Sequence, residues 1–162
     1  MSAVNTSIVA LAPAHAAAAA RLHIESQPGA FLPSLGPGVL AALYRTLPAT
    51  TVGFGFVAVA PAEHPPASPV VGFISATSSV GRLFVEVGGA LLPPLLARLA
   101  RRPALIGRSL QTLLYPLLTG DAHDKTPSPV EGGSAELLSI MVEPAWRGQG
   151  IGGQLLDALV SA

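Results

Sequence analysis

The sequence predicts a single α/β domain in which short β-rich runs are combined with helix-forming segments. Four runs of β-branched and other apolar residues have the composition of strands, and several stretches between them have apolar residues at helical spacing. The runs at 51–60 and 69–77 flank the polar, Pro-rich stretch "PAEHPPAS", which predicts an antiparallel hairpin. A chain of 162 residues is also long enough to bury a core of its own.

The elements outside the hairpin follow from local composition. A β-rich run at 6–13 ends at a proline, and the Ala-rich segment 14–26 is a strong helix former. The stretch 38–47 carries apolar residues at helical spacing and predicts a second helix. After the hairpin, 83–118 predicts two or three short helices, because prolines interrupt it repeatedly.

The last part of the chain predicts a strand, a glycine-rich turn and a helix. A polar segment at 119–133, broken by Gly and Pro, has the composition of a loop. The run "AELLSIMV" at 135–142 predicts a strand that Pro144 ends. The run "GQLLDALV" at 153–160 predicts a helix with one broad apolar face.

Composition excludes several classes of protein. Half of the residues are hydrophobic and 11% are charged, so membrane insertion has to be considered. Prolines and arginines leave no stretch of about twenty uncharged apolar residues, and we expect no transmembrane segment, although peripheral membrane contact stays open. The net charge of zero gives no sign of nucleic-acid binding. The chain begins without the basic start of a secretory signal, and we expect a cytoplasmic protein.

Metal and disulfide chemistry are not predicted. The chain contains no cysteine, which excludes disulfides and thiolate ligands. No pair of His or acidic residues has convincing spacing for a metal site, so we expect no metal.

The most informative stretch is "VEPAWRGQGIGGQLL", at 142–156. The first N–H groups of a helix have no partner inside it, and the helix dipole adds partial positive charge there. Glycines before a helix let an anion approach these donors, so the stretch predicts a phosphate or pyrophosphate site. No Lys-Ser/Thr ending follows, which excludes a P-loop, and the dinucleotide pattern G-x-G-x-x-G is met only in part.

The longer run "SIMVEPAWRGQGIGGQLL" resembles the acetyl-CoA signature of the GNAT N-acetyltransferase superfamily. That signature is Gln/Arg-x-x-Gly-x-Gly/Ala, met here by Arg147, Gly150 and Gly152, and the resemblance covers about 135–160. It implies one domain over 1–162 with a mixed, mostly antiparallel sheet flanked by helices. Residues 78–134 would then be a helical insertion and loop between the third and fourth strands, where the family has a short turn.

The resemblance implies transfer of the acetyl group of acetyl-CoA by direct attack of a substrate amine. The strand backbone would bind the pantetheine arm, and the N–H groups of the glycine turn would hold the pyrophosphate. The side chain of Arg147 would serve the structure of the turn more than the ligand. The residues that would bind acetyl-CoA are Ile140, Met141, Val142, Arg147, Gly148, Gln149, Gly150, Ile151, Gly152 and Gly153.

Glu136 is the candidate general base, because some members of the family carry a glutamate at the matching place. Strand alternation predicts that Glu136 shares a face with Leu138, Ile140 and Val142. A partly buried carboxylate there would accept the proton of the ammonium group. The alternative is a glutamate at the end of a strand that faces solvent.

Other polar residues give weaker predictions. His15 and His23 lie on the first predicted helix, where they would border the acceptor site or occupy a solvated helix face. His64 and His123 receive no role. A basic cluster in the predicted insertion would meet an acidic substrate or a membrane surface, or keep the apolar helices soluble; it consists of Arg98, Arg101, Arg102 and Arg108.

The resemblance also implies that the fold continues beyond the signature helix, with further strands and a tyrosine that serves as general acid. We therefore expect the C-terminal part of the fold to be missing here: the sequence is a truncated product or fragment, or another chain completes it. A homo-oligomer also stays open as a partner. Two functions remain open beside the enzyme. One is a non-catalytic acyl-CoA-binding interaction module or incomplete fragment of the same fold, and the other is a peripheral membrane protein. The acceptor, of small-molecule, sugar or protein type, is not identified by the sequence.

Overall fold

The computed structural model describes residues 6–61, 69–101 and 135–162. Its centre is a four-stranded antiparallel sheet in which the strands are ordered as in the chain. The strands are β1 (Ser7–Ala10), β2 (Gly53–Val59), β3 (Val70–Thr77) and β4 (Glu136–Val142). This mixed α/β architecture agrees with the predicted fold class.

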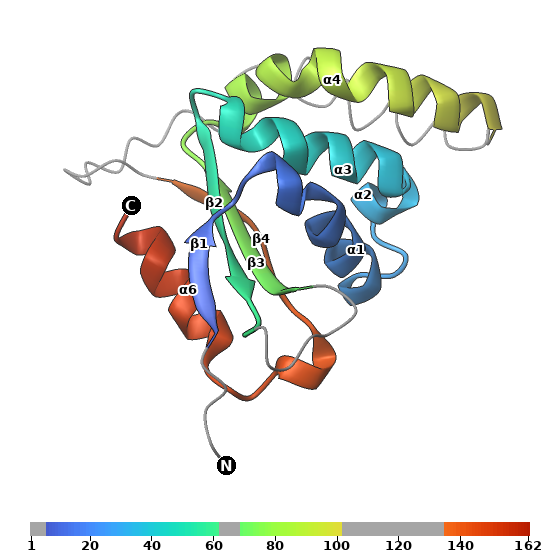
Figure 1. Cartoon of the computed structure of the whole chain (residues 1–162). Helices are drawn as coiled ribbons and strands as arrows, with labels where there is room; N and C mark the ends of the chain where they lie inside the picture. The colour runs from blue at the N-terminus through green and yellow to red at the C-terminus, as the bar shows by residue number, and fades with distance from the viewer. Residues whose placement is uncertain (1–5, 62–68, 102–134) are drawn as a thin grey trace.

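Helices lie on both faces of the sheet (Figure 1). One face is covered by α1 (Ala16–Ser26) and α3 (Pro37–Thr46), with the short α2 (Phe31–Ser34) between them in the chain. α4 (Val80–Arg101) packs on α3 as the outermost layer, and α6 (Ile151–Val160) covers the other face. Three 3-10 turns complete the described elements: η1 (Pro13–His15), η2 (Leu47–Ala49) and η4 (Pro144–Trp146).

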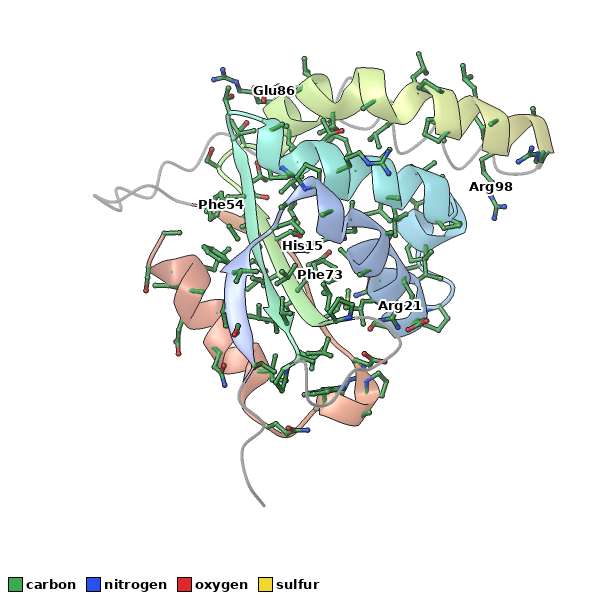
Figure 2. The ribbon with its side chains drawn as sticks, viewed as in Figure 1. His15, Arg21, Phe54, Phe73, Glu86 and Arg98 are labelled. Carbon is green, nitrogen blue, oxygen red and sulfur yellow. The ribbon has the colours of Figure 1, made fainter. Side chains whose placement is uncertain are left out.

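Apolar cores on both faces of the sheet hold the layers together, and a third, smaller cluster of Leu35, Val39 and Leu95 joins α3 to α4. Between the sheet and α1, α3 and α4, Phe73 of β3 lies among the helices (Figure 2) and meets the ring of Tyr44 edge-on, with ring centroids 4.9 Å apart. On the other face, Ile151 and Leu155 of α6 are buried against β3. A Cβ at Gly72 would meet the Met141 carbonyl oxygen at 3.1 Å and Leu155 at 3.3 Å, so this glycine lets β4 and α6 approach β3 closely.

The predicted strands and most predicted helices are confirmed. β2 and β3 form the expected antiparallel hairpin, with Phe56 opposite Ile74. α1, α3, β4 and α6 lie within two or three residues of the predicted positions, the usual uncertainty of an element's ends.

The prediction of short helices at 83–118 was wrong for the part that the structure describes. α4 runs unbroken for 22 residues and contains both Pro93 and Pro94. Two prolines cost the helix two backbone hydrogen bonds. Apolar packing on both sides of them opposes this loss, because Val87 is buried before them and Leu95 after them. The remainder of the predicted insertion, 102–134, lies outside the described residues, as do Arg102, Arg108, His64 and His123.

Half of the argument for predicting no transmembrane segment was wrong, because α4 passes Pro93 and Pro94 unbroken, whereas the charged residues Glu86 and Arg98 do lie within it. By length and composition alone, α4 is apolar enough to cross a membrane, and only 17% of its most apolar window is buried. Core helices of water-soluble proteins can meet the same criterion, so it does not distinguish the two cases.

Candidate functional site: a strand edge and a glycine turn

β4 is an edge strand among the described residues, paired only with β3. Its hydrogen bonding alternates along the strand, as in any antiparallel pair. The N–H of Glu143 donates to the Val71 carbonyl at 2.8 Å, and Met141 lies opposite Phe73 two positions earlier. The backbone groups of Met141 therefore face β3, whereas those of Ile140 and Val142 face the open edge.

Arg147 connects this open edge to the glycine turn. Its Nε donates a hydrogen bond to the Val142 carbonyl at 2.9 Å, across five positions of the chain. The guanidinium thus occupies one of the outward acceptors of β4 and fixes the turn against the strand end. The N–H and C=O of Ile140 and the N–H of Val142 remain directed to the open side.

The turn itself uses backbone conformations that favour glycine. Gly148 and Gly150 have φ angles of +76° and +80°, which residues with a Cβ rarely adopt. Gly150 is the N-cap of α6, and its carbonyl accepts the first helical bond, from Gln154 at 3.1 Å. No described residue accepts a hydrogen bond from the N–H groups of residues 151–153.

The space beside these donors is open. A Cβ built at Gly148, Gly150, Gly152 or Gly153 would have no described neighbour within 4 Å. Free donors, a positive helix end and open space together suit an anionic ligand. The side chain of Ile151 is buried, so only the backbone N–H of this residue is accessible to a ligand. Gln149 is half-buried, with its amide nitrogen 3.5 Å from the Ala145 carbonyl.

Glu136 does not lie where strand alternation predicted. The register of β3 and β4 shifts between Ser75 and Ala76, so Ser139 lies opposite Ser75 while Leu137 lies opposite Ala76. This irregularity inserts one residue and reverses the faces beyond it. Glu136 lies opposite Thr77 and so shares the face of Ser75, away from Ile140 and Val142. It is also exposed, not partly buried.

His23 and Tyr44 form a buried polar pair that the sequence did not reveal. His23 Nδ1 and the Tyr44 hydroxyl are 2.5 Å apart, and both side chains are almost fully buried. Burial lowers the pKa of His23 and raises the pKa of Tyr44 to about 12, because each charged form would lose its hydration. The prediction of a solvated face was therefore wrong for His23. His15 is half-buried, and its Nδ1 accepts from the Ala12 N–H at 3.2 Å.

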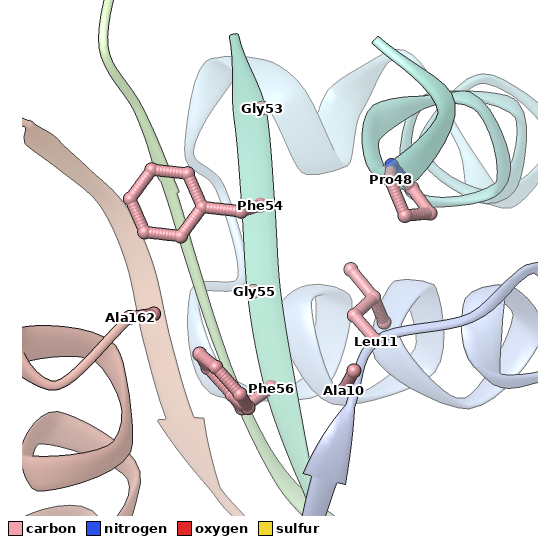
Figure 3. Close-up of a pocket in the computed structure, with 8 residues that line it drawn as sticks. All are labelled: Ala10, Leu11, Pro48, Gly53, Phe54, Gly55, Phe56 and Ala162. Carbon is pink, nitrogen blue, oxygen red and sulfur yellow. The ribbon is translucent and has the colours of Figure 1, made fainter. Parts of the chain in front are cut away.

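A small cavity lies at the opposite edge of the sheet, where β1 leaves β2 (Figure 3). It has a volume of about 330 Å³ and is lined mainly by apolar side chains and glycines, among them Phe54, Phe56 and Leu11. None of the predicted site residues lines it. Among the described residues, no group of three His, Asp or Glu side chains could hold a metal ion.

One comparison with known proteins agrees with this geometry. The sequence model of the acetyltransferase (GNAT) family matches residues 117–162, which include β4, the glycine turn and α6. Over this stretch the chain is similar to the GNAT family. No curated protein and no solved structure matches the chain. GNAT proteins are enzymes of the acyltransferase type, and they typically use acetyl-CoA.

Proposed function

We propose that this chain is an N-acetyltransferase of the GNAT type, which transfers the acetyl group of acetyl-CoA to an amine. The proposal rests on one observation: Arg147 holds the glycine turn at the start of α6 against the open edge of β4. The free N–H groups at the start of α6 suit a pyrophosphate, and the open edge of β4 that leads to them suits an extended chain of amides.

The residues of the site fit acetyl-CoA in charge and shape. Residues 151–153 would donate N–H groups to the pyrophosphate, and the positive φ angles of Gly148 and Gly150 shape the turn that exposes them. Ile140 and Val142 would pair with the amides of the pantetheine arm, as an added strand pairs with an edge. The backbone of Met141 is engaged with β3, so the side chain and backbone of Met141 support the strand rather than the ligand.

Acetyl-CoA supplies an acyl group that is activated as a thioester. The amine nitrogen of the substrate attacks the thioester carbonyl, the C–S bond breaks, and the CoA thiol leaves. The attacking nitrogen loses a proton, which a general base accepts directly or through water. Glu136 remains our candidate base, and its exposed position requires that the acceptor reach it on the face shared with Thr77.

Calorimetry with CoA, followed by a thiol-release assay with acetyl-CoA and a panel of amines, tests the proposal. We expect CoA binding and turnover with at least one amine. Binding without turnover on any amine would favour a non-catalytic acyl-CoA-binding module. Absence of CoA binding would contradict the proposed site itself.

A further inference from the structure

Exposed apolar residues lie along the open edge of β4, on the side of the sheet that α6 covers. Ile140 lies opposite Ile74, which packs on α6, and Leu137 lies opposite Ala76 on the same face of β3. Leu137 is 50% exposed and Ile140 is 37% exposed. From Leu137 to Val142 the strand has no charged residue and no proline, which commonly keep a strand edge from pairing. This edge is therefore suited to receive a further strand.

One flank of α6 continues this apolar surface. Gln154 lies on the flank toward β1, because its Oε1 accepts a hydrogen bond from the Thr6 hydroxyl at 3.4 Å. Leu156 follows two positions later, about 200° around the helix, and Val160 lies one turn beyond it. These two residues therefore lie on the flank toward β4, where they are 45% and 79% exposed. Strand and helix together form one apolar edge surface, defined by Leu137, Ile140, Leu156 and Val160.

The two ends of β4 carry opposite charges. Glu136 begins the strand and is exposed. Arg147 is exposed at the other end, where its Nε donates to the Val142 carbonyl. In the part of the chain that the structure describes, neither Glu136 nor Arg147 forms an ion pair. Two such strands in antiparallel orientation would bring each charge to its opposite, so the edge is complementary to itself.

We infer that the apolar edge surface binds a second copy of the chain through antiparallel pairing of two β4 strands. A two-fold axis beside Ile140 lets the N–H of each Ile140 donate to the C=O of the other. The same pairing brings Leu156 and Val160 of the two copies together, because both α6 helices then cover one face of the joined sheet. It also brings Glu136 of each copy to the strand end at which Arg147 of the other copy lies.

The backbone of β4 favours this occupant over a lipid surface. The N–H and C=O of Ile140 point to the open edge, and a partner that covers the apolar residues around them must also satisfy both groups. Lipid chains cannot form hydrogen bonds with them. A second β4 strand offers the same groups in the matching arrangement, together with the same apolar neighbours.

This pairing would regulate the proposed CoA site, and that part of the inference rests on the proposed function. The pantetheine arm would use the same N–H and C=O of Ile140 that the second copy uses. One edge cannot serve both, so CoA should dissociate the dimer. By linkage, dimerisation should weaken the binding of CoA in return.

Sedimentation equilibrium of the full chain over a concentration series tests the pairing. We expect a monomer–dimer equilibrium whose dissociation constant rises roughly ten-fold or more when Leu156→Glu and Val160→Glu are combined. The matched control combines Val85→Glu and Leu92→Glu on α4, at residues that are 82% and 53% exposed, and should dimerise like the parent. Glu136→Lys should weaken the dimer as well, because it brings like charges together at both ends of the paired strands.

Amide hydrogen exchange tests whether the contact involves the backbone of β4. The Ile140 N–H should exchange slowly in the dimer and rapidly after dilution to the monomer. The Met141 N–H is the internal control, because it faces β3 and should be protected in both states. Rapid exchange at Ile140 in a sample shown to be dimeric would overturn the pairing of the strands.

Calorimetry with CoA separates this inference from the proposed function. We expect CoA to bind, to dissociate the dimer, and to bind with lower apparent affinity as the chain concentration rises. CoA binding that leaves the dimer intact would overturn the shared use of the edge. Absence of CoA binding would contradict the proposed function alone, and the variants would still decide the pairing.

Two further results would overturn the pairing itself. The first is a parent chain that stays monomeric at every concentration. The second is a dimer that the α6 pair of substitutions and the α4 pair weaken equally, which would place the interface elsewhere. Circular dichroism confirms the fold of each variant, and Glu136→Lys tests the strand end independently of the substitutions on α6.

Discussion

Replacing Gly150 by alanine separates the role of the glycine turn in stability from its role in binding. Gly150 has a φ of +80° and open space at the position of a Cβ. The cost in stability is therefore that of holding an L-residue in the left-handed region, about 1–2 kcal/mol. For a domain of this length we expect the melting temperature to fall by roughly 2–8 °C.

Gly29→Ala is the matched control. Gly29 has a φ of +89° and also has no described neighbour within 4 Å of a built Cβ, but it lies in the turn after α1. Both variants should lose similar stability. Only Gly150→Ala should lose CoA affinity, because relief of its strain would turn the N–H groups of residues 151–153 away from the ligand.

The assay is calorimetric CoA binding at a temperature well below both melting transitions, with each melting curve measured in parallel. For Gly150→Ala we expect a dissociation constant for CoA that is at least ten-fold larger, which corresponds to a loss of about 1.4 kcal/mol of binding free energy. Equal CoA affinities in Gly150→Ala, Gly29→Ala and the parent would refute the role of the turn as an anion site. An equal loss of CoA affinity in both variants would show that the substitutions weaken binding by destabilising the whole domain.

Three further substitutions test single contacts. Arg147→Lys should weaken CoA binding nearly as much as Arg147→Ala in calorimetry, because lysine cannot reproduce the Nε bond to the Val142 carbonyl; full affinity in the lysine variant would instead assign the role to charge. Glu136→Gln should lower kcat by roughly 100-fold or more if Glu136 is the base, and an unchanged kcat would identify a solvent-facing glutamate. The imidazole of His23 has a pKa near 6.5 in the unfolded chain and a lower pKa in the folded protein, so the unfolded chain binds the proton more readily. Stability should therefore fall as the pH drops below about 6.5 toward the lowered pKa of the folded state, in melting curves, and His23→Gln should flatten this dependence.

The sequence predicted the turn at Gly148–Gly150 and the start of α6 because local chemistry determines both. Positive φ angles require glycine or a few tolerant residues, and a helix start requires only the residues that follow it. These features do not depend on distant contacts.

The position of Glu136 and the continuity of α4 were not predictable in the same way. The irregularity between Ser75 and Ala76 depends on how two strands pair, and nothing in "AELLSIMV" marks it. The passage of α4 through Pro93 and Pro94 depends on tertiary packing, which outweighs local preference. The His23–Tyr44 contact joins two helices whose relative placement a single sequence does not give.

The pairing of β4 with β3 has a consequence for the order of folding. The pairing of β2 with β3 closes the loop of residues 60–69, whereas the pairing of Thr77 with Glu136 closes the much longer loop of residues 78–135. By the logarithmic dependence on loop length, the second closure costs about 1.5 kcal/mol more chain entropy than the first. β4 should therefore join after the hairpin and the helices α1 and α3 have formed their core. The strand that carries the proposed CoA site would then be the last to dock, and a ligand bound there would hold the final step of folding in place.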